Sequence, residues 1–429
     1  MREPDAAADE RAPLRNVTEQ QSGTGWSRRR ALAAIGSVGT LGLAGCSLPS
    51  VTAGADPLWV REFTAASAAG PPAATDDHVV VGGQDRRLHG FTADGERVFT
   101  VETGGPIEAR PAVPASGGPV HAHSTDGDLY TVGLSGEELW HVEGQAKNGW
   151  LGRRGSLLVG TDSVAETVVG YDARTGTRRF RRPGREYPFP ILSDEACILH
   201  VDLPDGDGKL VTLAPTTGEV LWESTPRDSY PYIVAVGDRV VTVRDSTVRM
   251  RHARDGHVLW EASVAGKVTS HAGPPIWVGE HVYVRADRDD RPDELVAIDR
   301  DEGTVAWRRR VGAELETVTA TTQAVFVASS VNDPDGGILI RLDAFALGGT
   351  RRWQTTTDIA IGGTVEALGR VGDVLFAASE NKIAAYDPAS GTRRWQYDPE
   401  SYRIGVSAAD SALYVSLRDS GGIARLPTS

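Results

Sequence analysis

Short runs of apolar residues, bounded by polar turns that contain glycine, recur along nearly all of the chain after residue 56. A large aromatic side chain marks each repeat, and successive aromatic residues lie 38 to 47 positions apart. They are Trp59, Phe99, Trp140, Phe180, Trp222, Trp260, Trp307, Trp353 and Trp395. A glycine stands four positions before each of the last eight. Because glycine accepts a positive φ without steric cost, each of these glycines predicts a tight turn into the strand that carries the aromatic residue.

Within a repeat, the pattern of apolar residues is that of strands alone. One repeat predicts four strands separated by turn residues, which are Ala109–Ala115, Pro119–Ser124, Leu129–Leu134 and Glu138–Val142. Segments rich in valine occupy the second position of other repeats, as in His78–Gly82 and Arg239–Val243. No amphipathic helix of useful length is indicated after residue 45.

Four-stranded repeats of about 40 residues are typical of a β-propeller, in which small sheets bury their faces against one another around an axis. The chain ends indicate how the ring closes. Pro57–Phe63 holds a lone fourth strand with Trp59, and Tyr402–Pro427 holds three strands without a fourth. The sequence therefore predicts an all-β fold, with one propeller of eight or nine blades over residues 57–429. We expect the nine aromatic residues to act as structural anchors that cover the gaps between neighbouring blades.

The first 45 residues read as an export signal. Arg28 and Arg29 precede an apolar run from Ala31 to Ala44, and this arrangement resembles a twin-arginine signal. The run is too short to cross a bilayer, and it ends in Leu-Ala-Gly-Cys at Cys46, which resembles a lipobox. This resemblance implies cleavage before Cys46 and lipidation of its thiol, with residues 46–56 as a flexible tether. An ordinary signal with an incidental cysteine is the alternative.

Charge and cysteine content narrow the classes of function. The net charge is −13, from 58 acidic and 45 basic residues. This charge argues against nucleic-acid binding, which needs clustered bases. An acid-rich, lysine-poor chain resembles proteins of halophilic archaea. Two cysteines, Cys46 and Cys197, exclude a disulfide framework, and Cys197 lies in an apolar run that predicts a buried thiol.

The repeat motif carries a family resemblance. Tyr171–Phe180 reads Tyr-Asp-Ala-Arg-Thr-Gly-Thr-Arg-Arg-Phe, and Leu213–Trp222 and Tyr386–Trp395 follow the same pattern. These segments resemble the repeat of the pyrroloquinoline-quinone-type propellers. That family includes quinone-dependent dehydrogenases and non-enzymatic lipoprotein propellers of the BamB type. In size, lipobox and paired chain ends, this chain resembles the second group. The dehydrogenases use adjacent cysteines and a Ca²⁺ site, which are not recognisable here, so we expect no cofactor; bound quinone is the alternative.

Three features were considered as sites of chemistry. His121 and His123 share one face of a strand, but no third ligand for zinc is near in sequence, so a polar strand face is the preferred interpretation. Acidic segments occur at 205–208, 287–294 and 332–336, and none has the spacing of a twelve-residue calcium loop. Elongated acidic hairpins are the preferred interpretation of them. No catalytic set of residues is recognisable.

Aromatic residues that are not anchors gather between the outer strand of one blade and the inner strand of the next. They are Trp150, Tyr187, Tyr230, Tyr232 and Tyr402. In a propeller these connections lie on one face, near the central channel, where Tyr and Trp can form a recognition surface. Packing inside the channel or between blades is the alternative interpretation.

Together these observations predict a non-catalytic, monomeric propeller that is lipid-anchored on the outer face of the cytoplasmic membrane. There it would serve as a scaffold or accessory subunit for envelope or membrane proteins. Two other hypotheses remain open: a quinone-dependent dehydrogenase with an atypical site, and a carbohydrate- or peptide-binding propeller.

Overall fold

The computed structural model divides the chain into two units, Met1–Ser50 and Val51–Ser429. It describes residues 54–62, 70–114, 117–144, 151–162, 165–183, 190–202, 208–224, 232–266, 275–287, 292–333, 338–359, 364–399, 404–409, 411–417 and 421–429. All of them belong to the second unit, and none of them forms an α-helix.

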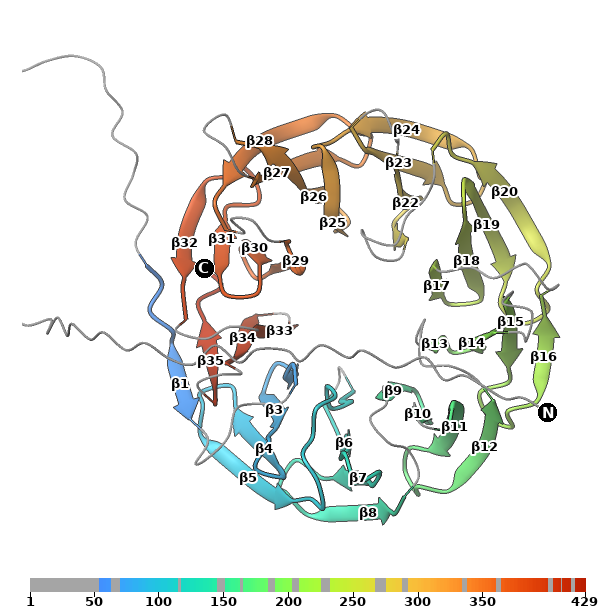
Figure 1. Ribbon diagram of the computed structural model, residues 1–429, viewed down its shortest axis with the longest axis vertical. Coiled ribbons are helices and arrows are strands. Elements are labelled where there is room, and N and C mark those ends of the chain that lie inside the picture. Colours follow the sequence, from blue (N-terminus) through green and yellow to red (C-terminus); the bar gives the residue numbers. More distant parts are fainter. Residues whose placement is uncertain are drawn as a thin grey trace, which may run out of the picture. The chain divides into compact units, whose positions relative to one another are not determined.

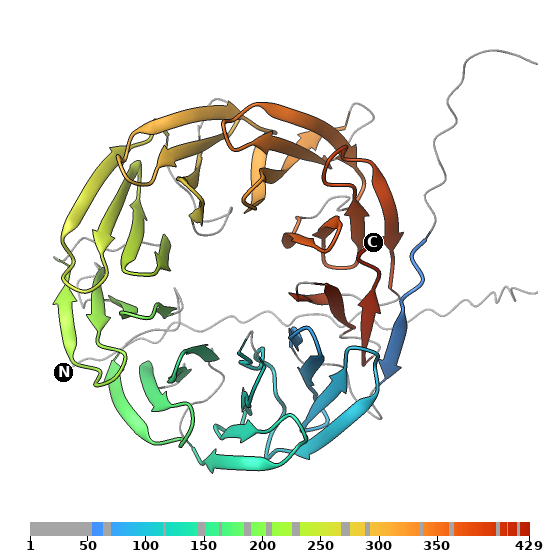
Figure 2. The same ribbon diagram turned by 180° about the vertical axis from the view of Figure 1, so that it is seen from behind.

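Nine small antiparallel sheets follow one another around a ring, with the fourth strand of each sheet along the circumference (Figures 1 and 2). Blade 1 contains β2 (Ala73–Ala74), β3 (His78–Gly82), β4 (Arg87–Thr92) and β5 (Arg97–Glu102). Blade 2 contains β6 (Val120–His123), β7 (Leu129–Val132) and β8 (Glu138–Val142). Blade 3 contains β9 (Leu151–Arg154), β10 (Leu157–Asp162), β11 (Thr167–Asp172) and β12 (Arg178–Pro183).

Blade 4 contains β13 (Ile191–Leu192), β14 (Cys197–Asp202), β15 (Gly208–Leu213) and β16 (Val220–Glu223). Blade 5 contains β17 (Tyr232–Val236), β18 (Arg239–Arg244), β19 (Thr247–His252) and β20 (Val258–Ser263). Blade 6 contains β21 (Ile276–Val278), β22 (His281–Ala286), β23 (Glu294–Asp299) and β24 (Val305–Arg310). Blade 7 contains β25 (Glu314–Ala320), β26 (Ala324–Asn332), β27 (Ile338–Ala346) and β28 (Arg351–Thr357). Blade 8 contains β29 (Ala367–Val371), β30 (Val374–Ala378), β31 (Ile383–Tyr386) and β32 (Arg393–Tyr397). Blade 9 contains β33 (Ile404–Ala409), β34 (Ala412–Leu417), β35 (Gly422–Leu426) and β1 (Trp59–Glu62).

The two ends of the ring close as the sequence predicts. β1 pairs antiparallel with β35, from Trp59 opposite Arg425 to Glu62 opposite Gly422, and it completes blade 9. The prediction of an all-β propeller is therefore confirmed, and the number of blades is nine.

Blade 2 departs from the predicted pattern. The segment Ala109–Ala115 was expected to form its first strand, but within the described residues of that segment only Ala112 pairs, in a single bridge to His121. Pro111 and Pro114 flank Ala112, and proline has no backbone N–H to donate to a neighbouring strand. The regular ladder of this blade is therefore limited to β6, β7 and β8.

The hydrophobic core is divided among the boundaries between blades. Nine clusters of buried apolar side chains each join two neighbouring blades, and every cluster includes one of the nine aromatic anchors. A four-stranded sheet of this size has two apolar faces, which only its neighbours can cover. Packing between blades, rather than one central core, therefore stabilises the ring.

Candidate functional site

The repeated aromatic residue and glycine form a contact between blades. Trp307, on the outer strand of blade 6, donates from Nε1 to the carbonyl oxygen of Leu347 at 2.7 Å, in the turn between β27 and β28 of blade 7. Its ring lies between Tyr283 and Phe345, with centroid distances of 5.8 and 6.2 Å. Gly349 in that turn has a φ of 82°, and a Cβ atom there would lie 2.7 Å from Cδ2 of Trp307. The glycine thus permits both the turn and the close approach of the ring.

The same arrangement recurs around the ring. Six tryptophan anchors donate Nε1 to a carbonyl oxygen in the turn between the third and fourth strands of the next blade: Trp59 to Ala93, Trp140 to Ala173, Trp222 to Ala253, Trp260 to Arg300, Trp307 to Leu347 and Trp353 to Pro388. The rings of Phe99 and Phe180 lie against Gly136 and Gly218 in the same way. Each glycine therefore accommodates the anchor of the preceding blade, a relation that sequence spacing did not reveal. The aromatic residue and the glycine of the motif therefore serve packing between blades.

The aspartate of the motif stabilises its own turn. Oδ1 of Asp172 accepts the backbone N–H groups of Arg174 and Thr175 at 3.0 and 3.1 Å, and Oδ2 accepts Nη2 of Arg179 at 2.7 Å. The hydrogen bond from Arg179 is the main cause that lowers the pKa of Asp172 to about 2. Asp387 has the same partners in blade 8, with Arg394 as its guanidinium, and its pKa is also lowered to about 2.

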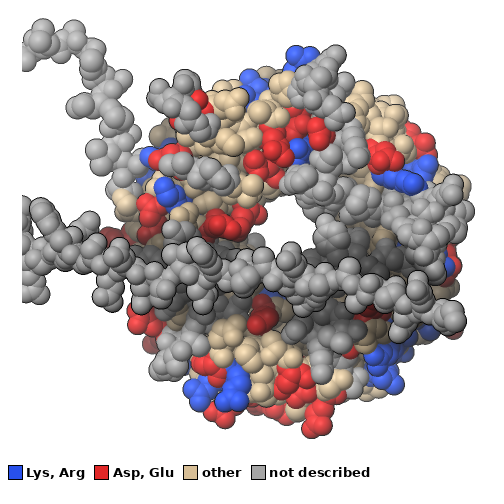
Figure 3. Space-filling model, in the orientation of Figure 1, with Lys and Arg blue, Asp and Glu red and all other residues tan. Residues whose placement is uncertain are grey.

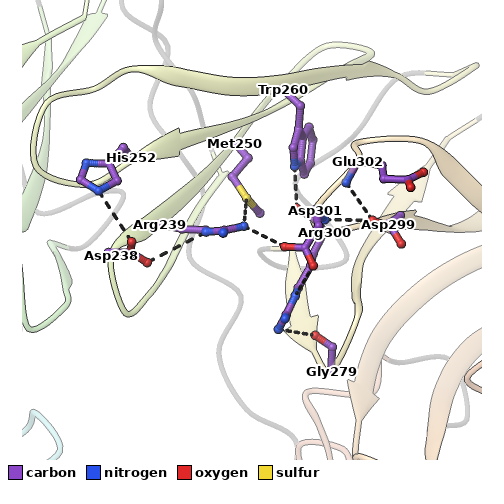
Figure 4. Close-up of polar contacts among 10 residues, drawn as sticks. All are labelled: Asp238, Arg239, Met250, His252, Trp260, Gly279, Asp299, Arg300, Asp301 and Glu302. Atoms are coloured by element: carbon purple, nitrogen blue, oxygen red, sulfur yellow. Dashed lines mark hydrogen bonds and ion pairs between the residues drawn. The ribbon is translucent and has the colours of Figure 1, made fainter.

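Charged side chains on the face that carries these turns pair across blades (Figure 4). Nη1 of Arg239 in blade 5 donates to Oδ1 of Asp301 in blade 6 at 3.0 Å. Behind it, Nε2 of His252 lies 3.6 Å from Oδ2 of Asp238, and Nη1 of Arg300 donates to the carbonyl oxygen of Gly279 at 3.1 Å. These side chains are partly exposed, and exposed ion pairs contribute at most about 1 kcal/mol each. The contact between Arg239 and Asp301 joins the two blades.

Only parts of the three acidic segments of the sequence belong to the described residues, and residues 288–291 lie outside them. Asp293, from 287–294, is buried and lies 2.8 Å from Nη2 of Arg285, and it accepts the backbone N–H of Leu315 at 2.7 Å. Burial raises the pKa of Asp293, and the N–H of Leu315 and the charge of Arg285 act in the opposite direction. Residues 205–207 and 334–336 lie outside the described part of the chain. No group of three His, Cys, Asp or Glu side chains that could hold a metal ion occurs among the described residues.

The interpretation of His121 and His123 as part of a polar strand face is wrong, because both are buried against blade 3. Nδ1 of His121 lies 2.7 Å from Oγ1 of Thr131, and its ring is 5.8 Å from that of Trp140. Burial lowers the pKa of His121 to about 3, so its imidazole is neutral at ordinary pH. The apolar environment, which faces the next blade, could not be read from the alternation along β6.

Cys197 is fully buried, as its apolar neighbours in sequence predict. Burial raises the pKa of its thiol to about 12, so the thiolate form is absent at neutral pH. A nucleophilic or redox role needs an accessible thiolate. Cys197 is therefore a packing residue of the boundary between blades 3 and 4.

The predicted recognition surface and export residues fall mainly outside the described residues. Trp150, Tyr187, Tyr230 and Tyr402 lie outside them, and Tyr232 is described only as a backbone position at the start of β17. Arg28, Arg29 and Cys46 also lie outside. The roles suggested for these residues stay predictions. Among the described residues, we find no helix that is long and apolar enough to cross a bilayer.

Comparison with known proteins identifies the repeat. The family model described as "Outer membrane protein assembly factor BamB" matches residues 50–165, 152–242 and 244–419, which together cover most of the chain. The chain belongs to this family. A curated relative with the same description, from Nitrosomonas eutropha, is 27% identical over 232 residues, which are 49% of this chain and 52% of the relative. The chain therefore matches only about half the length of that BamB relative.

Solved structures agree with the fold. BamB from Moraxella catarrhalis superposes with a TM-score of 0.51 at 13% identity, over 86% of this chain and 98% of that one. The computationally designed Ika8 protein gives a TM-score of 0.54 at 16% identity, over 74% and 95% of the two chains. At such low identity the likeness concerns the fold alone. The sequence resemblance to BamB-type propellers is nevertheless confirmed by the family match.

Proposed function

We propose that this protein is a lipid-anchored, non-catalytic propeller that acts outside the cytoplasm as an accessory subunit for envelope proteins. The observation that carries this proposal is the match of the BamB family over residues 50–419, because the members of that family named here are outer-membrane protein assembly factors. The roles of the repeat residues agree with it, since the motif aromatic, glycine and aspartate all act within the ring.

The point where the chain enters the ring supports an orientation for this function. β1 starts at the face that carries the turns between third and fourth strands, where Leu58 donates its backbone N–H to the carbonyl oxygen of Arg425. Before β1, the described chain meets the ring at Gly54 and Ala55, on the outer edge of β32. A tether from a lipidated Cys46 would therefore reach the ring at its rim. The outer strands β8, β12, β16 and β32 end at the opposite face, just before the sequence segments that carry Trp150, Tyr187, Tyr230 and Tyr402. We propose that partners dock on this second face.

Affinity purification from membranes tests the proposal. The tagged wild-type chain should co-purify with envelope proteins, and Cys46→Ser should leave the chain as an unprocessed precursor or release it from the membrane. Normal lipid labelling of Cys46→Ser would refute the anchor.

An enzymatic assay provides the opposite outcome. The purified mature chain should not oxidise alcohols or sugars when quinone and Ca²⁺ are added. Turnover under these conditions, or a tight stoichiometric quinone complex, would overturn the non-catalytic role in favour of a quinone-dependent dehydrogenase.

A further inference from the structure

The rim of blade 3 carries several exposed arginines close together. β12 carries Arg178, Arg181 and Arg182 with exposed side chains, and Arg174 in the preceding turn is exposed as well. Figure 3 shows basic atoms gathered over β12, at the lower right of the ring. The chain as a whole has a net charge of −13, so this concentration of positive charge is local.

Some arginines on other rims lie close to carboxylates of the protein. In blade 6, Arg308 and Arg310 both lie 4.0 Å from Glu294. In blade 8, Arg394 lies 2.7 Å from Asp387.

On β12 only Arg179 has such a partner, Asp172 at 2.7 Å. Arg174, Arg178 and Arg181 have no ion pair with any described residue, and Arg182 donates to the carbonyl oxygen of Gly218 at 3.1 Å. This rim therefore presents positive charge that the described part of the ring does not neutralise.

The outer edge of a blade can accept a further extended segment, and blade 8 shows how. Gly54 pairs in parallel with Gln396 of β32, and the backbone N–H of Ala55 donates to the carbonyl oxygen of Gln396 at 2.8 Å. Gln396 is the residue that follows the anchor Trp395. β32 is otherwise the last strand of its sheet, so this contact adds a short segment beyond the fourth strand.

The outer edge of β12 in blade 3 is equivalent to the outer edge of β32 in blade 8. It is the last strand of its sheet, and its register shifts between Gly170 and Tyr171 just as that of β32 shifts between Ala385 and Tyr386. Arg181 follows the anchor Phe180 as Gln396 follows Trp395. Outside the ladder with β11, no backbone hydrogen bond from a described residue reaches the carbonyl oxygen of Arg181. An edge strand with unpaired backbone groups is a template for another strand.

We propose that the outer edge of β12 binds an extended acidic segment of a partner protein, which adds to blade 3 as a fifth strand. Backbone groups of the segment pair with the edge. Arg181 and Arg182 are adjacent in β12 and point to opposite faces of the sheet, so carboxylates on both faces of the added segment meet the arginines. This inference deepens the proposed function, because it names the chemistry by which an envelope partner is recognised. The edge favours a peptide over a lipid surface, since a lipid headgroup has no strand to add.

Peptide binding to the mature chain tests this inference. The probe is a short labelled peptide of Glu, Val and Thr that places Glu on both faces of the extended chain, and fluorescence anisotropy measures its affinity. Binding should weaken as salt rises, because exposed charges are screened. The triple variant Arg178→Gln, Arg181→Gln and Arg182→Gln should weaken binding by about tenfold or more, since several charge pairs are lost together.

The matched control removes the same charge elsewhere on the rim. Arg308→Gln, Arg310→Gln and Arg352→Gln together should leave the affinity for the peptide within about twofold of the wild type, because a screened charge far from the edge adds little. Circular dichroism of both variants checks that the ring stays folded. Equal loss in the two triple variants, or unchanged binding in the β12 variant, overturns the site.

Two further measurements separate strand addition from other modes. A peptide methylated on alternate backbone nitrogens should bind much more weakly, and equal affinity overturns the addition of a strand. Vesicles that contain phosphatidylglycerol should not compete with the peptide; binding to vesicles that depends on the β12 arginines overturns the choice of partner. The proposed anchor is tested by membrane recovery, which depends on Cys46 and not on β12. A failure of peptide binding at β12 therefore leaves the proposed anchor and accessory role unaffected.

Discussion

Two boundaries between blades each contain a tryptophan anchor, and they differ in whether its indole N–H makes a hydrogen bond. Between blades 6 and 7, Trp307 donates Nε1 to the turn that joins β27 and β28. Between blades 8 and 9, Nε1 of Trp395 is buried and has no hydrogen-bond partner among the residues that the structure describes. The third and fourth strands of blade 9 are β35 and β1, which come from opposite ends of the chain, so no turn joins them. The carbonyl that accepts the indole elsewhere is therefore missing where the ring closes without a covalent link.

Residues 54–62 compensate for that missing turn by contacting three blades. Ala55 bonds to Gln396 of blade 8, and Leu58 bonds to Arg425 of blade 9. Trp59 donates to the carbonyl oxygen of Ala93 at 2.8 Å, and Arg61 donates from Nε to that of Gly95 at 2.6 Å, both in blade 1. A strand from the distant end of the chain thus joins the seam on both sides.

The largest expected effect comes from removing this strand. A chain that starts at Phe63 should lose more than about 3–5 kcal/mol of unfolding free energy, which is the usual cost of deleting one buried tryptophan side chain. Denaturant titration against a chain that starts at Val51 measures the difference. Equal midpoints for the two chains would show that β1 does not close the ring.

A smaller effect is expected where a turn glycine supports an anchor. Gly303→Ala places a Cβ 2.7 Å from Trp260 at a φ of 70°, whereas Gly237→Ala changes a glycine with a φ of 60° and no atom within 4 Å. The left-handed backbone alone should cost about 1–2 kcal/mol in both variants. The clash with the ring should add about 1–3 kcal/mol in Gly303→Ala only. Equal destabilisation of the two variants, measured by urea unfolding, would mean that the Trp260 ring moves aside at no measurable cost in free energy.

The comparison of the two boundaries is tested directly by replacing each indole. Trp307→Phe and Trp395→Phe lose similar ring area, but only the first breaks a hydrogen bond and leaves the carbonyl of Leu347 unpaired. Trp307→Phe should therefore destabilise the protein by about 1 kcal/mol more than Trp395→Phe. Thermal or urea unfolding measures both variants. If Trp395→Phe is the more harmful of the two, the indole N–H of Trp395 has a hydrogen-bond partner.

The smallest effect concerns the acid limb of the stability curve. The pKa of Asp387 is lowered from 3.8 to about 2, chiefly by the hydrogen bond from Arg394. The contribution of Asp387 to the free energy of unfolding is therefore complete above pH 3.8 and is lost as pH falls through about 2. Asp387→Asn should lower stability at neutral pH by about 0.2–1 kcal/mol, because the carboxylate is partly exposed. The gap between the two proteins should close as pH falls from about 4 to 2. A gap that stays constant with pH would assign the effect to the turn rather than to the charge.

Several local features could be predicted from the sequence because they depend on neighbours in the chain. The strand His78–Gly82 coincides with β3, and the glycines before the anchors have positive φ. Cys197 is buried, as its apolar neighbours indicate. These outcomes rest on alternation, turn chemistry and side-chain hydrophobicity, which act over a few residues.

The predictions that depend on distant contacts were incomplete or wrong. His121 and His123 alternate with Ala122 in a way that suggests a polar strand face, yet both histidines are buried. The rim charge of β12 and the edge that Ala55 occupies on β32 involve residues far apart in sequence. The candidate surface at Tyr187 and Tyr230 was visible only as a cluster of aromatic residues, without the contacts that would give it a role.

The sequence by itself determined the repeat, the turns, the identity of the anchors and the need for the chain ends to meet, because each is encoded in a short pattern that recurs. The tertiary structure decided that there are nine blades, that each turn glycine lies beneath the anchor of the preceding blade, and that Trp395 alone among the tryptophan anchors lacks the bond to a following turn. These outcomes depend on how one blade meets the next. That contact joins residues about 30 to 40 positions apart, beyond the reach of any local pattern.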